Sequence, residues 1–316
     1  MCTFNGAPYL RQQLESLSRQ TRLPDELVVS DDGSTDTTIE ILEEFEKAAS
    51  FSVRIFRNPA NLGTTKNFEQ TIVRCKGDVI VLADQDDVWL SEKLRVFEYA
   101  FTSQPSVDLV FSDAEIVGAD LVPLGYTLWE AVGLNEQRQK MMRSHRALDL
   151  LLRQNFVTGA AMAFRTRLIR TFLPIPACWM HDAWISINAA LVSELLPIAA
   201  TTLKYRQHGK NQVGITRRPA VSAVCGKSRD SRAYLHIVEE TEALLAHVRW
   251  LLAEHRIKED AVAIRAVQDK LRHFQARTRE GGRIWIVRSS IAELMSGRYQ
   301  RFSERGFRSF LKDCFL

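Results

Sequence analysis

The chain has 316 residues, of which 46% are hydrophobic and 25% are charged. This balance excludes intrinsic disorder, and no run of 18 apolar residues is present that would predict a membrane-spanning helix. The net charge of +4 divides unevenly, because residues 217–316 carry 20 Lys+Arg against 12 Asp+Glu and residues 1–216 carry the other 22 against 26. The basic C-terminal part suits an anionic surface. The five scattered cysteines, without a CxxC pair, argue against a disulfide framework or a structural zinc site and fit a reducing cytoplasm.

Short apolar segments alternate with helical patterns from the start of the chain. Leu10, Leu14 and Leu17 recur at helical spacing, and Pro8 suits a first helical turn. The predicted elements are, in order, a helix at 8–20, a strand at 26–30, a helix at 34–48, a strand at 51–58, a helix at 64–75, a strand at 77–84, a helix at 90–101 and a strand at 107–113. This alternation predicts βαβ units, a parallel sheet and an α/β fold.

Two acidic clusters directly follow predicted strands. SDDGS follows the strand at 26–30, and ADQDD closes the strand at 77–84. Ligands of parallel sheets bind at the carboxyl ends of the strands. Both clusters are therefore expected to open toward one crevice.

The strand pattern fades after about residue 217. Apolar residues recur at helical spacing over 231–255 and 259–276, until Gly281 and Gly282 interrupt the pattern. These observations predict a catalytic domain at 1–216 and a mainly helical, basic extension at 217–316.

Three carboxylates are crowded into the segment VLADQDDVWL, at Asp84, Asp86 and Asp87. A divalent cation would make this crowding favourable, since Mg²⁺ and Mn²⁺ prefer oxygen ligands and Mg²⁺ commonly binds one or two carboxylates together with substrate phosphates. The alternative is that Asp86 or Asp87 caps the helix that begins near Leu90.

A set of short segments carries a resemblance to a known family. CTFNGAPYLRQQLESLSRQT, LVVSDDGSTDTT, NLGTTKNF and ADQDDVW occur in this order, followed by FVTGAAMAFR, WMHDAWIS and YRQHGKNQVG. Together they resemble glycosyltransferase family 2, and the full set is similar to the bacterial rhamnosyltransferase-type members that build cell-surface polysaccharides. The resemblance covers residues 1 to about 215. It implies a GT-A fold, with a Rossmann-like sheet flanked by helices, and a UDP- or dTDP-sugar donor whose diphosphate is held through Mn²⁺ or Mg²⁺.

The resemblance also implies roles for individual residues around the diphosphate. Asp86 matches the metal-binding carboxylate, and Asp84 lies beside the nucleotide and the donor sugar. His208, in QHG, matches a position that closes over the diphosphate and can ligate the metal, and a neutral imidazole suits Mn²⁺ better than Mg²⁺. Lys66 could meet the diphosphate as a point charge, or lie solvated near the start of its helix. Asp87 stays open between a direct role and a helix cap.

The segments near the donor base supply further candidates. By position in the family, a carboxylate after LVVS accepts the imide N–H of uracil or thymine, and Asp32 is a better match than Asp31. The alternative for both is a turn, because Asp-Gly favours turns. Thr3 and Phe4 match the segment that lines the base, although Phe4 could equally belong to the core.

Asp182 matches the general base that acts on the acceptor hydroxyl. The family usually has Glu-Asp here, whereas this chain has His181 before Asp182, which leaves the role of His181 in doubt. A carboxylate can act as a base if burial raises its pKa toward the working pH. The alternative for Asp182 is a helix N-cap, and Trp184 could line the acceptor site or pack in the core.

One departure from the family concerns the start of the chain. An apolar strand precedes CTFNG in the family, whereas here Met1 stands inside the end of that strand. We therefore expect that the first strand is truncated and that the start codon lies upstream. Loss of a central strand would leave unpaired backbone groups.

The leading hypothesis is an inverting glycosyltransferase that moves a sugar, with rhamnose as a candidate, to a hydroxyl of a glycan or lipid-linked glycan, without a nucleic-acid partner. The metal would stabilise the leaving diphosphate in one in-line displacement. A sugar-phosphate nucleotidyltransferase is a second hypothesis, but MCTFNGAPYL lacks its Gly-rich, basic phosphate loop. A third hypothesis is an inactive glycan-binding or scaffold protein.

The C-terminal segment YQRFSERGFRSFLKDCFL suggests peripheral contact with the inner face of the cytoplasmic membrane. Taken as one helix, it places apolar residues on one face with basic residues alongside, at Phe302, Phe307, Phe310, Leu311 and Cys314, with Arg301, Arg305, Arg308 and Lys312. Such a helix can lie among anionic headgroups. The alternative is that this face packs as ordinary core against residues 231–276.

Overall fold

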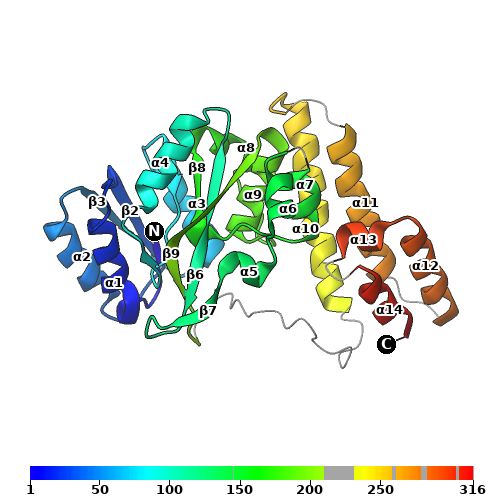
Figure 1. Ribbon diagram of the computed structural model, residues 1–316, viewed down its shortest axis with the longest axis horizontal. Coiled ribbons are helices and arrows are strands. Elements are labelled where there is room, and N and C mark those ends of the chain that lie inside the picture. Colours follow the sequence, from blue (N-terminus) through cyan, green and yellow to red (C-terminus); the bar gives the residue numbers. More distant parts are fainter. Residues whose placement is uncertain (145, 210–230, 258–260, 279–282, 304–305, 316) are drawn as a thin grey trace. The chain divides into compact units, whose positions relative to one another are not determined.

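The computed structural model describes residues 1–144, 146–209, 231–257, 261–278, 283–303 and 306–315 (Figure 1). The chain divides into two compact units, and we describe each by itself. Unit one comprises Met1–His145 and Phe156–Arg218, and unit two comprises Arg146–Asn155 and Pro219–Leu316. The short segment at 146–155, which the sequence analysis includes in the catalytic domain, thus belongs to unit two.

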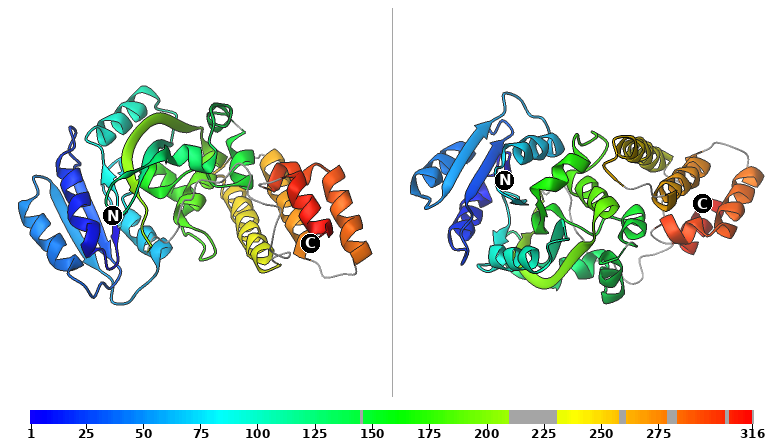
Figure 2. Two further views of the ribbon diagram at one scale, coloured as in Figure 1. Left: turned by 60° about the horizontal axis from the view of Figure 1, so that its bottom comes forward. Right: turned by 90° about the horizontal axis from the view of Figure 1, so that it is seen from above.

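Unit one begins with a parallel three-stranded sheet in the order β1-β2-β3. Cys2 of β1 pairs with Ser30 of β2, and Glu26 of β2 pairs with Ser52 of β3. The elements of this half are β1 (Cys2–Thr3), α1 (Ala7–Ser18), β2 (Glu26–Asp31), α2 (Thr38–Ala48), β3 (Ser52–Arg57) and α3 (Thr64–Arg74). In Figure 2, α1 and α2 lie on one face of this sheet and α3 lies on the other. The predicted βαβ alternation is confirmed here.

The second sheet of unit one is mixed, which differs from the all-parallel sheet predicted from the sequence. Its strands are ordered β4-β8-β6-β9-β5, and β7 also pairs with β6. Only β6 and β9 run parallel, while the other pairs are antiparallel. The strands are β4 (Val79–Val81), β5 (Val88–Trp89), β6 (Leu109–Val117), β7 (Pro123–Thr127), β8 (Met162–Arg165) and β9 (Leu195–Arg206). The predicted strand at 77–84 is shortened to β4, because the chain leaves the sheet at Leu82 to form the acidic loop.

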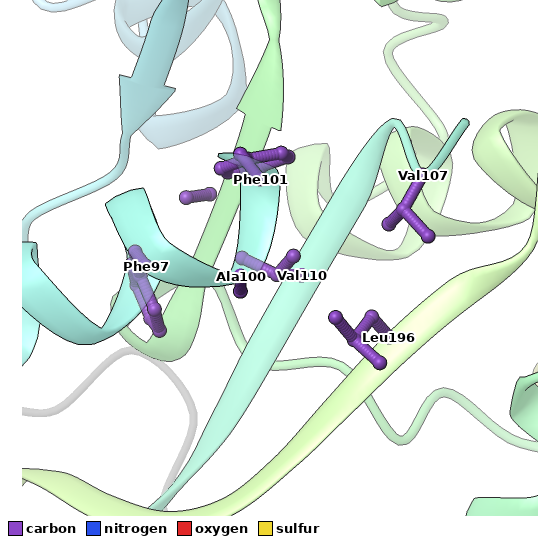
Figure 3. Close-up of a cluster of buried hydrophobic side chains, with 7 residues drawn as sticks. Phe97, Ala100, Phe101, Val107, Val110 and Leu196 are labelled. Carbon is purple, nitrogen blue, oxygen red and sulfur yellow. The ribbon is translucent and has the colours of Figure 1, made fainter. Parts of the chain in front are cut away.

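Two helices of 11 and 12 residues and several shorter ones complete unit one. They are α4 (Lys93–Ser103), α5 (Leu128–Val132), α6 (Glu136–Met142), α8 (Ile169–Phe172) and α9 (His181–Val192), with the 3₁₀ turns η1 (Gly159–Ala161) and η2 (Thr166–Leu168). The face of α4 that carries Phe97 and Phe101 packs on the second sheet (Figure 3). The other members of this cluster are Ala100, Val107, Val110, Ala163 and Leu196. Removing a buried phenylalanine side chain typically costs about 3–5 kcal/mol, so this cluster anchors α4 firmly.

An apolar cavity in unit one is lined by residues of β2, β4, α3 and α4. Its volume is about 600 Å³, and its lining includes Val28, Val79, Val81, Phe68 and Phe97. Met1 reaches its rim, where the α-amine donates to the Val28 carbonyl at 2.8 Å.

Unit two is a bundle of helices. It contains α7 (Ala147–Arg153), α10 (Ser231–Ala253), α11 (Ala261–Thr278), α12 (Arg283–Met295), α13 (Arg298–Phe302) and α14 (Phe307–Phe315). Arg301 of α13 binds Asp149 of α7 at 2.7 Å, which ties the 146–155 segment to the C-terminal helices. No helix in the described parts of the chain is long and apolar enough to cross a bilayer.

The C-terminal segment does not form the single helix considered in the sequence analysis. Helix α13 ends at Phe302 and α14 begins at Phe307, so the apolar residues lie on two separate helices. Phe302 and Cys314 are buried in the bundle, whereas Phe307 and Leu311 are 52% and 40% exposed. Core packing therefore accounts for part of the proposed apolar face, and α14 alone presents the rest to solvent.

A buried polar network holds the helices of unit two together. His273 lies between Glu293, 2.8 Å from its Nδ1, and Ser303, 3.0 Å from its Nε2. Arg277 donates to Ser303 Oγ at 2.9 Å and pairs with Asp313 at 2.7 Å. Burial lowers the pKa of the His273 imidazole in this network, against the effect of its hydrogen bond with Glu293.

Candidate active site

The acidic loop after β4 forms the centre of the site. Asp87 is buried, and its Oδ1 accepts the backbone N–H of Arg206 at 3.0 Å. Burial and repulsion by Asp86 raise the pKa values of both Asp84 and Asp87. The helix-cap alternative does not describe this loop, because α4 begins at Lys93 and its N-cap residue is Glu92.

Asp86 and His208 meet across the site. Asp86 Oδ2 lies 2.8 Å from His208 Nε2, and the side chains are 17% and 10% exposed. The His208 ring stacks on Tyr9 with centroids 4.5 Å apart. The structure thus places the two residues that the resemblance matches to the metal next to each other, while their role as metal ligands stays a prediction.

This pair suits a divalent cation that is completed by a substrate. The two facing atoms, a carboxylate oxygen and an imidazole nitrogen, are both ligand types of Mn²⁺. No group of three or more His, Cys, Asp and Glu side chains in the described ranges could hold a metal ion alone. Asp86 and His208 would therefore share the ion with phosphate oxygens and water, which is usual for phosphate-bound Mg²⁺ and Mn²⁺.

Arg206 is a central residue of the site that the sequence analysis did not single out. Its buried guanidinium donates to the Asp86 carbonyl at 2.6 Å, the Ala119 carbonyl at 2.6 Å and Gln12 Oε1 at 2.5 Å. It also lies over the Tyr9 ring, 4.7 Å from the centroid. Arg206 thus fixes the acidic loop through its backbone, and its position in YRQHG, two residues before His208, was the only available signal.

The two aspartates after β2 have different surroundings. Asp31 accepts from Thr3 Oγ1 at 2.8 Å and from the backbone N–H groups of Gly33 and Ser34. Gly33 has a φ of +84°, a conformation that glycine adopts without strain. The turn alternative therefore describes Asp31, and Thr3 contributes to that turn.

Asp32 retains one open acceptor position. Its Oδ1 accepts from Asn58 and from the Leu62 backbone, and its Oδ2 accepts from the Gly63 backbone, each at 2.9 Å. A carboxylate has about four lone-pair sites, so one on Oδ2 has no hydrogen bond from the described residues. Asp32 is only 3% exposed, and its role in reading the base stays a prediction.

Phe4 projects from the end of β1 and is 46% exposed, so it does not belong to the core. Its backbone is held by Gln85 of the acidic loop: the Phe4 N–H donates to Gln85 Oε1 at 2.9 Å, and Gln85 Nε2 donates to the Phe4 carbonyl at 3.0 Å. Gln85 thereby couples the base-lining segment to the acidic loop. It too was overlooked in the sequence.

Lys66 has partners of its own. Its Nζ binds Glu69 at 2.9 Å and donates to the Ile175 carbonyl at 2.8 Å. Its side chain is 40% exposed. The structure therefore ties this lysine to α3 and the segment near Ile175, and none of its contacts is with the acidic loop.

Asp182 stands in the first turn of α9. Its Oδ2 accepts the Gly159 N–H at 3.1 Å, and its Oδ1 accepts the N–H of Ala183 at 2.6 Å. It lies close enough to Asp84 for its charge to contribute to the raised pKa of that carboxyl. The α9 N-cap residue is Met180, so Asp182 is inside the helix.

The neighbours of Asp182 are part of the core. His181 is 5% exposed, stacks on Phe68 with centroids 4.0 Å apart, and has a pKa lowered by burial. Trp184 is fully buried, and its indole N–H donates to the Phe172 carbonyl at 2.6 Å. Packing therefore explains Trp184, which does not line an acceptor site. Both ring nitrogens of His181 are buried without a hydrogen-bond partner among the described residues.

The carboxylates from separate elements converge. Burial, followed by the charges of Asp87, Asp84, Asp86 and Asp182, raises the pKa of Tyr205 in β9. A tyrosine can be influenced by all of them only if they surround one place. Carboxylates of the loop after β4 and of α9 therefore lie near one place, around Tyr205. The predicted crevice between SDDGS and ADQDD concerns Asp31 and Asp32 instead, and it stays a prediction.

The family model described as Glycosyl transferase family 2 matches residues 1–172. The dTDP-rhamnosyl transferase RfbG of Shigella flexneri is 33% identical over 99 residues, which cover 30% of this chain and 34% of the relative.

Among solved structures, S. aureus TarS 1–349 in complex with UDP-GlcNAc matches 99% of this chain and 80% of its own, with a TM-score of 0.59 and 16% identity. The mannosyltransferase PcManGT from Pyrobaculum calidifontis, in complex with GDP-Man and Mn²⁺, matches 99% of this chain and 84% of its own, with a TM-score of 0.52 and 12% identity. At these identities, both similarities support the fold.

Proposed function

The chain belongs to glycosyltransferase family 2, and from this premise we propose that it is a metal-dependent, inverting enzyme of cell-surface polysaccharide synthesis. It would transfer a sugar from a nucleoside diphosphate to a hydroxyl of a glycan or lipid-linked glycan. The observation that carries the proposal is the convergence of Asp84, Asp86 and Asp182, with His208 facing Asp86 at 2.8 Å.

The donor would bind across the acidic loop. Asp86 and His208 would hold Mn²⁺ or Mg²⁺, and the bound ion would neutralise charge on the departing diphosphate. Phe4 offers an exposed ring to the base, and the open acceptor position of Asp32 suits the imide N–H of uracil or thymine. Asp84, next to this ensemble, would face the donor sugar.

Asp182 would act as the general base. Its carboxylate would take the proton of the acceptor hydroxyl while that oxygen attacks the anomeric carbon and the nucleoside diphosphate departs from the opposite face. One displacement inverts the configuration, and no covalent enzyme intermediate is required. The hydrogen bond from Gly159 fixes the rotamer of the base, and holding reactants in line contributes strongly to rate.

Rhamnose is the donor sugar that we propose to test first. Its support is the 33% identity with a protein named dTDP-rhamnosyl transferase, over 99 residues. The structural neighbours bind UDP-GlcNAc and GDP-Man, which supports a nucleotide-sugar donor in general.

We also propose that the enzyme works at the inner face of the cytoplasmic membrane. Exposed Phe307 and Leu311 on α14, with Arg308 exposed alongside, suit shallow insertion among anionic headgroups. The test is flotation with anionic vesicles, comparing the whole chain with the Phe307→Ser/Leu311→Ser variant. Equal binding by both, or binding by neither, would contradict this docking mode.

The decisive assay for function is the release of nucleoside diphosphate from dTDP-rhamnose and UDP-sugars, with Mn²⁺ and with EDTA. We expect release that requires metal and rises when a glycan acceptor is added. Pyrophosphate release from a nucleoside triphosphate and a sugar phosphate would instead support a nucleotidyltransferase. Binding of glycan without any turnover would support a scaffold protein.

A further inference from the structure

Lys93 is a buried lysine beside the active site that the proposed mechanism does not use. It is the first residue of α4, and none of its surface is exposed. A buried ammonium group is costly unless it is paired and hydrogen-bonded. Its partners therefore indicate what the group does.

The ammonium group makes one hydrogen bond that spans two elements. Nζ donates to the Ala160 carbonyl at 2.5 Å, in the η1 turn. It also lies over the Trp89 ring, 4.2 Å from the centroid, which directs it away from solvent. Burial lowers the pKa of Lys93 to about 7, whereas the charges of Asp87 and Asp84 favour its protonated form. Lys93 Nζ is thus held between the acidic loop and η1.

The η1 turn in turn holds Asp182. The N–H of Gly159, the residue before Ala160, donates to Asp182 Oδ2 at 3.1 Å. The turn also packs tightly on the start of α9, because a Cβ added at Gly159 would lie 2.9 Å from His181 Nε2 and 3.6 Å from Asp182 Cβ. A shift of η1 would therefore change the orientation of the Asp182 carboxylate.

We propose that Lys93 is a positioning residue for the transfer step: its ammonium group anchors η1 through the Ala160 carbonyl, and η1 orients the Asp182 carboxylate through the Gly159 N–H. The inference deepens the proposed function and rests on it for the role of Asp182. It assigns Lys93 to the acceptor side of the reaction, although Lys93 lies next to the acidic loop in the chain.

The main test is Lys93→Met, which removes the charge and the hydrogen bond but keeps an unbranched apolar side chain. A misplacement of about 1 Å can cost on the order of 100-fold in rate, so we expect kcat to fall about 10- to 100-fold. Nucleoside diphosphate affinity, measured as Kd by calorimetry with Mn²⁺, should stay within about twofold of the wild-type value. Weaker nucleotide binding with unchanged kcat would mean that Lys93 only balances the charge of the acidic loop, and would overturn the proposal.

Lys270→Met is the matched control. Lys270 is also a buried lysine, 8% exposed, with its pKa lowered to about 8 by burial, but it lies in unit two beside Glu240. Its replacement should leave kcat unchanged. Equal losses in both variants would attribute the effect to the removal of any buried lysine and would overturn the proposal.

Gly159→Ala provides a second variant that leaves Lys93 in place. The added methyl group must displace the turn from His181, so the same loss of kcat with preserved nucleotide binding is expected. This variant tests the link if Lys93→Met does not fold. Normal turnover in a folded Gly159→Ala protein would contradict a role for the η1 position.

A double-mutant cycle and an activity-independent measurement complete the test. If Lys93 acts through Asp182, then Lys93→Met should add no further loss to Asp182→Asn, whereas multiplied effects would overturn the proposal. Amide hydrogen exchange at 158–161 should be faster in Lys93→Met than in Lys270→Met. Unchanged exchange would refute the anchoring of η1, whether or not the wild-type protein is active. Absence of transferase activity in the wild-type protein would instead count against the proposed function.

Discussion

Replacing Arg206 with leucine should destabilise unit one and loosen the acidic loop together. The substitution removes the donor to the carbonyls of Asp86 and Ala119 and to Gln12 Oε1, which it holds at 2.5–2.6 Å. Each acceptor left without a partner costs about 1–3 kcal/mol when buried. The three acceptors are partly buried, so we expect the free energy of unfolding to fall by about 3–5 kcal/mol, in the lower part of the summed range.

Urea and thermal unfolding of the Arg206→Leu protein measure this loss. For a domain of about 200 residues each kcal/mol corresponds to about 2–4 °C, so the Tm of unit one should fall by about 6–20 °C. Arg11→Leu is the control, because Arg11 pairs with Glu44 at 2.8 Å while both side chains are about 60% exposed. Such surface pairs contribute about 0–1 kcal/mol. A fall of less than about 2 °C for Arg206→Leu, or equal falls in both variants, would refute the reasoning.

Three further predictions concern the two units. Asp86→Asn should nearly abolish transfer and leave the Tm within a few degrees, because the metal loses its carboxylate; near-normal turnover at saturating Mn²⁺ would show that Asp86 is not a ligand. Asp182→Asn should lower kcat by roughly 10²- to 10⁴-fold and spare donor binding; lost donor affinity with preserved turnover would exclude it as the base. Burial lowers the pKa of His273, so between pH 7 and 5 the unfolded chain binds a proton that the folded bundle does not. Unit two should therefore lose stability to urea as the pH falls from 7 to 5, ahead of any loss due to Glu293, whose pKa is also lowered; His273→Gln should remove most of this early loss, and an unchanged pH profile in that variant would contradict the assignment.

The sequence predicted the first half of unit one better than the second. Residues 26–31 and 52–57 are short, buried or half-buried strands between amphipathic helices, and local periodicity identifies such units. β9 went unrecognised because Leu195–Arg206 mixes buried ends with an exposed middle, so neither alternation nor a continuous apolar run marks it. The antiparallel partners of β4 and β6 depend on long-range pairing, which local pattern does not report.

For the site, the sequence identified some of the functional residues and missed others. Asp86 and His208 were singled out by the resemblance to the family, and the structure brings the two side chains together. Lys93 and Arg206 were overlooked because a lysine or arginine in a polar stretch is usually solvated, and only tertiary packing buries these two. Asp31 and Asp32 are adjacent and chemically identical, and only their hydrogen bonds distinguish a turn former from a group with an open acceptor.

The position of β9 late in the chain determines when the parts of the site become available during synthesis. β9 enters the second sheet between β6 and β5, brings Arg206 to the acidic loop and leads on to His208. At about 5–20 residues per second, roughly 6–25 s of translation separate Asp84 from His208. During that interval the nascent chain carries a strand edge on β6 that is still open and a set of acidic side chains without their basic partners. The site of unit one is thus completed late in synthesis, and a chain released before residue 195 would contain the acidic loop and Asp182 but neither Arg206 nor His208.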